Sequence, residues 1–231
     1  MNMRTLYTAV GHLRCQHDGP GRSHPVVLVN RREYLLDLQE MAVWTALSWR
    51  LLDLPQLEYH YERLVREAPM GERRTLEDCL KRLEVRGLVA AGTGDTDLEA
   101  MYDLLGSLYV VPISESTPLR LAVFFKLLLV KRAPLKTAAR LFRHDRPNER
   151  EAQVMALSRQ ALLSTAELIK CVETGAVDLS TDEKVMDALY SDPDTTSDNI
   201  AYQMLGAESR ASVTVAVANL FLRKQIIFER V

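Results

Sequence analysis

The sequence has few cysteines, no long apolar run and almost no net charge, and each shortage removes a class of protein. Its three cysteines, Cys15, Cys79 and Cys171, lie far apart without any paired spacing. This pattern is typical of reduced thiols in a cytosol and not of a disulfide-stabilised scaffold. No segment reaches the length of a membrane span, and residues 1–15 lack the apolar run of a signal peptide. We therefore expect a soluble cytoplasmic protein without a membrane partner.

The charge balance argues against a protein that coats nucleic acid through bulk electrostatics. The 29 Lys and Arg residues are offset by 31 Asp and Glu residues, which leaves a net charge of −2. Proteins that coat nucleic acid are usually strongly basic, so any contact with DNA has to come from local patches. Hydrophobic residues make up 47% of the chain and charged residues 26%, and these values are ordinary for a folded globular protein.

The sequence also lacks the short motifs that carry catalysis. It has no Gly-rich phosphate loop, no nucleophile elbow and no HExxH pair, and its scattered carboxylates follow no catalytic spacing. His12, Cys15, His17 and His24 lie close together in the sequence. A zinc site, however, needs four ligands in recognisable spacing with support from neighbouring groups. We therefore expect no enzymatic activity, no cofactor and no metal site.

The first segment of the chain is predicted to be extended. Residues 1–36 contain short apolar stretches separated by a polar turn. Within them, residues 24–30 (HPVVLVN) and the following 32–37 (REYLLD) indicate two strands around a turn at Asn30 and Arg31. These strands are expected to form a small antiparallel sheet.

Three helices are predicted next. Asp37 with Glu40 three residues later is a capping box, which predicts the start of the first helix. Pro55 predicts the start of the second helix. The third helix lies within Arg73–Val89, where leucines recur at helical spacing and Gly87 predicts a left-handed turn at the end.

A strand and a loop are expected to follow the third helix. Residues 88–91 are apolar, and residues 92–97 (GTGDTD) suit the loop of a wing. A strand, three helices, a strand and a wing in about sixty residues is the order of a winged helix, a variant of helix-turn-helix.

The rest of the chain is predicted to be mainly helical. Hydrophobic spacing indicates helices at 98–105, 119–130, 149–162 and 164–174, with a strand at 108–113. Ser180 with Glu183 forms a second capping box, which predicts a further helix. A turn at 191–198, a short helix ending near Leu205, a helix at 208–224 and a strand at 225–230 complete the prediction.

The end of the chain echoes the third helix. A shift of 137 residues sets the first copy against Arg210–Phe228, and five positions agree: Arg73 with Arg210, Thr75 with Ser212, Leu76 with Val213, Leu83 with Leu220 and Arg86 with Arg223. Two capped helices are predicted before each copy. The echo predicts a duplicated fold.

At these residues the chain resembles the winged-helix transcriptional regulators, the MarR-like group most closely. In that family the recognition helix is followed by a pattern like LxxxGLV and a hairpin wing, and LKRLEVRGLV at 80–89 matches it. The second copy, LFLRKQIIFERV at 220–231, lacks the glycine. The resemblance covers 37–97 and 180–231.

The resemblance implies a mainly α fold with small β-hairpins, an α+β arrangement of tandem winged-helix domains joined by a helical middle segment. The domains are expected at 1–97 and 179–231, with a helical dimerisation segment at 98–178 between them. It also implies a homodimer. The apolar run 119–130 is expected to be a buried helix or a dimer interface.

Duplex DNA is the partner that this resemblance implies. A winged helix places the first half of its third helix in the major groove, where Arg, Thr and Ser contact bases or phosphates. The predicted DNA-binding residues of the helices are Arg73, Arg74, Thr75, Lys81, Ser209, Arg210 and Ser212. Their alternative role is that of solvated surface residues, and Glu72, Glu77 and Asp78 beside the first set would repel phosphate.

A basic stretch supplies a second predicted DNA contact. Residues 131–150 carry seven Lys or Arg residues against Asp145 and Glu149, and the predicted contacts are Lys131, Arg132, Lys136, Arg140 and Arg143. A solvated helix face is the alternative. Residues 178–208 carry eight Asp or Glu residues against Lys184, so this face will not approach DNA.

Two functions are therefore predicted. The first is a DNA-binding transcriptional regulator that uses winged-helix recognition helices. The alternative is a winged-helix protein- or peptide-interaction module. Two strands followed by three helices also resemble the leader-peptide recognition elements of peptide-modifying systems, which bind a peptide as an added strand on a sheet edge. Tandem winged helices also serve as scaffolds in larger complexes, and the mild acidity of the chain favours this class.

Overall fold

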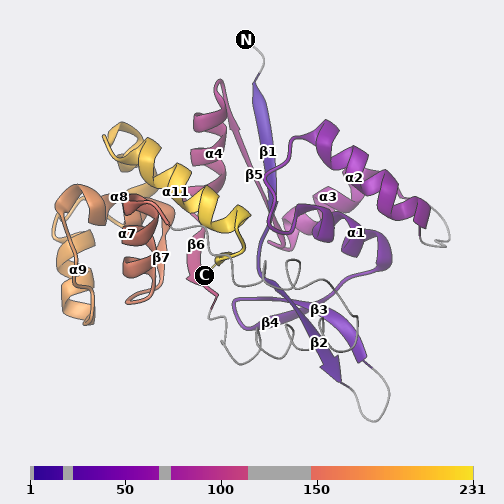
Figure 1. Ribbon diagram of the computed structural model, residues 1–231, viewed down its shortest axis with the longest axis horizontal. Helices are drawn as coiled ribbons and strands as arrows, with labels where there is room; N and C mark the ends of the chain where they lie inside the picture. Colours follow the sequence, from indigo (N-terminus) through magenta and orange to yellow (C-terminus); the bar gives the residue numbers. More distant parts are fainter. Residues whose placement is uncertain (1–2, 18–22, 68–73, 114–146, 231) are drawn as a thin grey trace, which may run out of the picture.

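The computed structural model describes residues 3–17, 23–67, 74–113 and 147–230. Over these residues the chain is a mixed α+β protein with small antiparallel sheets, as the sequence predicts. Figure 1 shows α1–α3 on one side of the molecule and α7–α9 with α11 on the other, with strands between them. No helix in the described part of the chain is long and apolar enough to cross a membrane.

The first strand in the sequence lies between a partner strand and an isolated β-bridge. β1 (Arg4–Ala9) pairs antiparallel with β5 (Val89–Gly94), and Tyr7 lies opposite Ala91. On its other side Tyr7 forms two backbone hydrogen bonds with Leu52, of 2.8 and 3.1 Å. The N-terminal strand is therefore flanked by segments that come much later in the chain.

A separate three-stranded sheet follows β1, in the order of the chain. It consists of β2 (His12–His17), β3 (Ser23–Val29) and β4 (Arg32–Leu35), and it confirms the two strands predicted around residues 30 and 31. Asn30 and Arg31 have φ angles of 46° and 61°, the left-handed values that a two-residue hairpin turn requires.

Helices α1 (Leu38–Leu47), α2 (Leu54–Glu67) and α3 (Leu76–Val85) come next. The predicted capping box is confirmed, because the Asp37 side chain accepts from Glu40 N and the Glu40 side chain accepts from Asp37 N. α3 starts after Thr75, whose hydroxyl caps it by accepting from Asp78 N. Gly87 has a φ of 72°, so the predicted left-handed turn is confirmed.

The predicted wing loop at 92–97 is wrong. β5 continues to Gly94, and Thr96 then caps helix α4 (Asp97–Leu105) through a capping box with Glu99. A Cβ at Gly92 would lie 2.1 Å from the backbone nitrogen of Leu104, so the glycine is needed for α4 to pack directly on β5. Glycines that resemble a loop in the sequence serve here for close helix packing.

The second half is built from elements that the sequence predicts only in part. They are β6 (Tyr109–Pro112), α7 (Glu149–Ser158), β7 (Leu163–Ser164), α8 (Thr165–Thr174), α9 (Asp182–Tyr190), α10 (Ile200–Gln203), the 3-10 turn η2 (Met204–Gly206), α11 (Arg210–Leu222) and β8 (Ile226–Glu229). The helix predicted at 149–162 ends at Ser158. The capping box predicted at Ser180 is wrong, because Thr181 caps α9 by accepting from Lys184 N. The helix predicted at 119–130 lies outside the described residues.

The strand pattern of the first half recurs in the second. β6 lies between β7 and β8, and Val110 faces Leu163 on one side and Phe228 on the other. Tyr7 has the same position between Leu52 and Ala91. We call residues 4–94 the first repeat and residues 109–229 the second repeat.

The helices recur as well. Asn148 and Glu151 form a capping box on α7, as Asp37 and Glu40 do on α1. α11 packs on α7 as α3 packs on α1, so we treat α7, α8 and α11 as the counterparts of α1, α2 and α3, with α9, α10 and η2 inserted before α11. The sequence-based division instead starts the second unit at residue 179, which makes α9 and α10 the counterparts of α1 and α2, and it stays a prediction.

The two repeats are joined by direct contacts. Val10 N donates to Leu88 O at 2.9 Å in the first repeat, and the next residue, Gly11, donates to Phe228 O at 2.7 Å in the second. The Tyr102 hydroxyl on α4 donates to Ala201 O at 2.5 Å. The repeats therefore form one packed structure.

Candidate functional site

The residues predicted to bind DNA in the first repeat are partly engaged within the fold. The Arg74 guanidinium forms an ion pair with Asp37, and the Thr75 hydroxyl caps α3. The hydrogen bond and charge of Asp37 raise the pKa of Arg74. Lys81 is exposed, but Glu77 and Asp78 in the first turn of α3 are exposed beside it. Arg73 lies outside the described residues.

Two of the three corresponding residues of the second repeat, Ser209 and Arg210, contact neighbouring elements. Ser209 is buried, and its backbone N–H donates to the Glu173 carboxylate at 2.6 Å. The Arg210 guanidinium lies over the Tyr102 ring of α4, 5.5 Å from its centre. The Ser212 hydroxyl donates to the Ser209 carbonyl at 3.0 Å. Ser209 and Arg210 therefore contact α8 and α4, whereas Ser212 is exposed.

Lys131, Arg132, Lys136, Arg140 and Arg143 all lie outside the described residues.

The histidines considered as metal ligands do not converge. His12 lies opposite Leu28 in the β2–β3 register, whereas His24 lies opposite Gln16, four positions along β2. The side chains of Cys15 and His17 lie outside the described part of the structure. Among the described residues, no group of three or more His, Cys, Asp or Glu side chains could hold a metal ion.

A buried carboxylate fixes the position of α3 beside the small sheet. Glu40 is 2% exposed and forms ion pairs with Arg82 and Arg86 of 2.9 Å each. Arg86 also donates to Leu35 O on β4 at 2.6 Å, and its guanidinium lies 5.7 Å from the centre of the Tyr34 ring. This one arginine connects the end of α3, the start of α1 and the edge of β4.

The hairpin turn determines which backbone groups of β4 point away from β3. In a two-residue hairpin the residues that flank the turn exchange hydrogen bonds, and the pattern then alternates along the strands. Arg32 and Tyr34 therefore bond to β3, while Glu33 and Leu35 direct their N–H and C=O groups outward. The Arg86 hydrogen bond to Leu35 O is consistent with this orientation.

β4 is an open edge strand. Within the described residues it pairs with β3 alone, so the outward groups of Glu33 and the N–H of Leu35 have no backbone partner there. The Leu35 side chain is 64% exposed, and that of Leu38 at the start of α1 is 67% exposed. We call the outward backbone of Glu33 and Leu35, with Leu38 and Arg86, the β4 edge.

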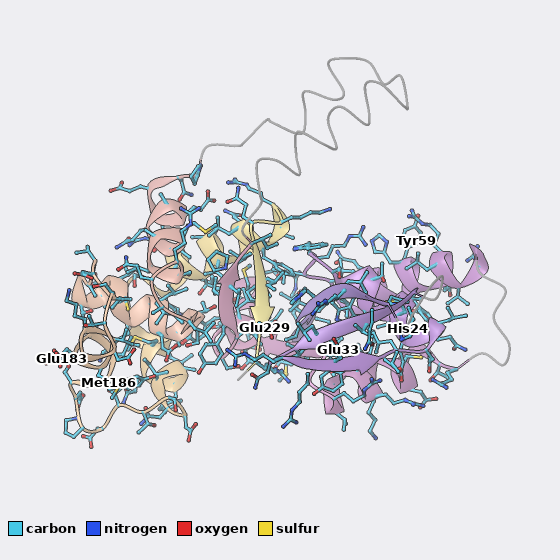
Figure 2. All side chains as sticks on the ribbon, turned by 90° about the horizontal axis from the view of Figure 1, so that it is seen from below. His24, Glu33, Tyr59, Glu183, Met186 and Glu229 are labelled. Carbon is cyan, nitrogen blue, oxygen red and sulfur yellow. The ribbon has the colours of Figure 1, made fainter. Side chains whose placement is uncertain are left out.

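Figure 2 shows Glu33 and His24 on the small sheet and Glu229 of β8 next to it. The Glu229 carboxylate accepts from Asn30 N at 2.9 Å, so the second repeat supports the turn that leads into β4.

β2 is the other outer strand of this sheet. By the same alternation Leu13, which is 49% exposed, points its N–H outward on β2, at the opposite edge of the sheet from β4.

Sequence reasoning found the strands of this site but not its arginine. Arg86 was noted because it matches Arg223 in the internal echo. Its role could have been found from a shared pattern, in which a capping-box glutamate is followed by an arginine at the end of the third helix. Glu151 and Arg223 follow the same pattern and form an ion pair at 2.8 Å.

Comparison with known proteins adds no identification: no protein-family model, no curated protein and no solved structure matches this chain.

Proposed function

We propose that this chain is a protein- or peptide-interaction module that binds an extended peptide as an added strand along the β4 edge. The observation that carries this proposal is that the outward N–H and C=O of Glu33 and the N–H of Leu35 have no backbone partner among the described residues. Strand addition uses such groups for affinity and alternate side-chain contacts for specificity. The exposed Leu35 and Leu38 side chains favour a peptide with apolar residues at alternate positions.

We also propose that each repeat is a winged-helix unit whose central strand precedes its first helix. The supporting observation is the strand order, in which β1 and β6 each lie between a short segment after the first helix and a strand after the third helix. In this arrangement the third helix is not followed by a wing hairpin, because β5 leads into α4.

Duplex-DNA binding by a transcriptional regulator stays a prediction. The side-chain contacts of the predicted DNA-binding residues favour it less than peptide binding. Arg74 is paired with Asp37, and Arg210 lies against Tyr102. A recognition helix needs its first turn free to enter a groove. An interaction role for the small sheet needs no rearrangement of these side chains.

The proposal can be tested with two matched proline variants and a displayed library of random peptides. Leu35→Pro removes the outward N–H from the β4 edge, while Leu13→Pro removes an outward N–H from β2. Both positions are exposed edge positions where proline is tolerated. Peptides selected on the wild type are expected to bind Leu35→Pro at least about tenfold more weakly. Binding to Leu13→Pro is expected to be unchanged.

Amide hydrogen exchange locates the bound peptide directly. Binding is expected to slow exchange at Glu33 and Leu35 and to leave the outward amide of Leu13 unchanged. Selected peptides that bind both proline variants as well as the wild type would overturn the β4 assignment. Retention of duplex DNA with a steep salt dependence that is lost in Arg74→Ala would support the regulator instead.

A further inference from the structure

A cavity between the two repeats is independent of the β4 edge. It has a volume of about 630 Å³, within the range of small-molecule sites. One wall comes from the end of β5 and from α4, and the other from α10, η2 and the first residue of α11. Its lining includes Asp95, Tyr102, Asp103, Tyr202, Leu205 and Arg210.

The Arg210 guanidinium in this cavity has no anionic partner among the described residues. The Arg210 guanidinium stacks on Tyr102, and within the described residues this side chain forms no hydrogen bond or ion pair. A planar guanidinium presents a fork of donors that matches a carboxylate in two parallel hydrogen bonds. The stacking on Tyr102 fixes one face of the guanidinium and leaves its edge for a ligand.

Three carboxylates surround the same space. Asp103 accepts from Thr93 N at 2.7 Å, and Glu99 accepts from Asp95 N and Thr96 N at 3.1 Å. The Asp95 side chain has no hydrogen-bond partner in the described part of the chain. Three carboxylates against one guanidinium disfavour a phosphate ligand and favour a ligand that also carries a positive group.

Aromatic and apolar groups complete the lining. The Tyr102 hydroxyl is held by Ala201 O, and burial raises the pKa of Tyr102 to about 12 although Arg210 opposes this shift. The phenol is therefore neutral at ordinary pH and keeps its bond across the two walls. Tyr202 is 78% exposed and Leu205 44% exposed, so both can cover an apolar group.

We propose that this cavity binds a small zwitterion, a free amino acid or a dipeptide. Its carboxylate lies against Arg210, its ammonium group against Asp95 and Asp103, and its side chain against Tyr202 and Leu205. Each charged end of the ligand then meets a group of opposite charge, and the one unpaired guanidinium of the cavity gains a partner.

Nuclear magnetic resonance titration with the standard L-amino acids and the dipeptide leucyl-tyrosine tests this proposal. The tightest ligand is expected to shift the amide signals of Asp95 and Tyr202. Its N-acetyl and C-amide derivatives are each expected to bind about tenfold more weakly, because each loses one charge-assisted contact. Arg159→Gln, at an exposed arginine away from the cavity, is the matched control and is expected to bind as the wild type does.

Substitutions separate the two ends of the ligand. In Arg210→Gln the C-amide derivative and the free acid are expected to bind equally, and in Asp95→Asn the N-acetyl derivative and the free amine are expected to bind equally. If Arg210→Gln does not fold, the Asp95→Asn comparison decides alone. The absence of amide shifts at about 10 mM of every ligand, or equal binding of capped and free forms to the wild type, overturns the proposal.

Discussion

The guanidinium of Arg223 lies 2.8 Å from the carboxylate of Glu151, a side chain that is 1% exposed. Arg86 and Glu40 have the same relationship in the first repeat, at 2.9 Å. In both repeats the glutamate belongs to the capping box of the first helix, and the arginine ends the third helix. One carboxylate thus caps a helix and attaches a second one to it, which explains why the geometry recurs although the sequences differ.

Removal of the Glu151 carboxylate is expected to lower the free energy of unfolding. Glu151→Ala leaves Arg223 and Asn219 without their shared acceptor, and breaking such a buried pair lowers the free energy of unfolding by about 3 kcal/mol. Glu149→Gln, on the exposed side of the same helix, is expected to change it by less than about 0.5 kcal/mol. Chemical denaturation measures both. Equal effects would show that the pair contributes no more than a surface residue.

The N-cap of α1 predicts an acid-sensitive stability. Desolvation alone would raise the pKa of Asp37, but the hydrogen bond from Glu40 N and the Arg74 guanidinium outweigh it and lower the pKa. The carboxylate therefore contributes stability above about pH 4, and the contribution is lost as the pH falls through the lowered pKa.

Asp37→Asn copies the residue at the equivalent position of α7, Asn148. The free energy of unfolding of wild type and variant is expected to differ most near neutral pH and to converge below about pH 4. Denaturant titrations across this range test it. A difference that is independent of pH would contradict the role of the charge.

The left-handed backbone conformation of Gly87 after α3 predicts that a substitution there lowers stability. Gly87→Ala is expected to lower the free energy of unfolding by about 1 kcal/mol, because φ is 72° and the nearest atom to a new Cβ is 3.8 Å away. The loss of stability then comes from the unfavourable backbone conformation of alanine and not from a steric clash. Gly206→Ala, where nothing lies within 4 Å and φ is not left-handed, is the control and is expected to be neutral or slightly stabilising in the same thermal melts.

The central position of β1 predicts a strong effect of proline there. Tyr7→Pro removes the N–H that donates to Leu52 O at 2.8 Å in the isolated β-bridge beside β1. It is expected to lower the free energy of unfolding by about 3 kcal/mol or more, whereas Leu13→Pro on the outer strand β2 is expected to be tolerated. Urea unfolding compares the two. A mild effect at Tyr7 would show that β1 is not an inner strand in solution.

Local signals allowed much of this fold to be predicted. The Asp37–Glu40 capping box, the turn at Asn30 and Arg31 and the left-handed Gly87 each depend on neighbours within a few residues. The placement of β1 depends on Ala91, a partner far along the chain, and no local pattern encodes that pairing.

The same limit applies to the candidate sites. The strands that form the β4 edge were predicted from hydrophobic patterns, but the hydrogen bond from Arg86 to Leu35 O joins residues 51 positions apart. The cavity around Arg210 requires α4 to pack against α11, which periodicity does not show. Arg210 was predicted as a surface contact because charge in a sequence does not reveal its tertiary neighbours.

β1 precedes in the chain both of the segments that flank it. Leu52 is synthesised after α1, and Ala91 only after α1, α2 and α3. β1 therefore cannot form all of its backbone hydrogen bonds until most of the first repeat has been synthesised. β6 likewise cannot complete its pairing until β8, which follows α11, has been synthesised. Each half of the molecule is thus expected to close late and cooperatively during synthesis, since contacts distant in sequence form slowly.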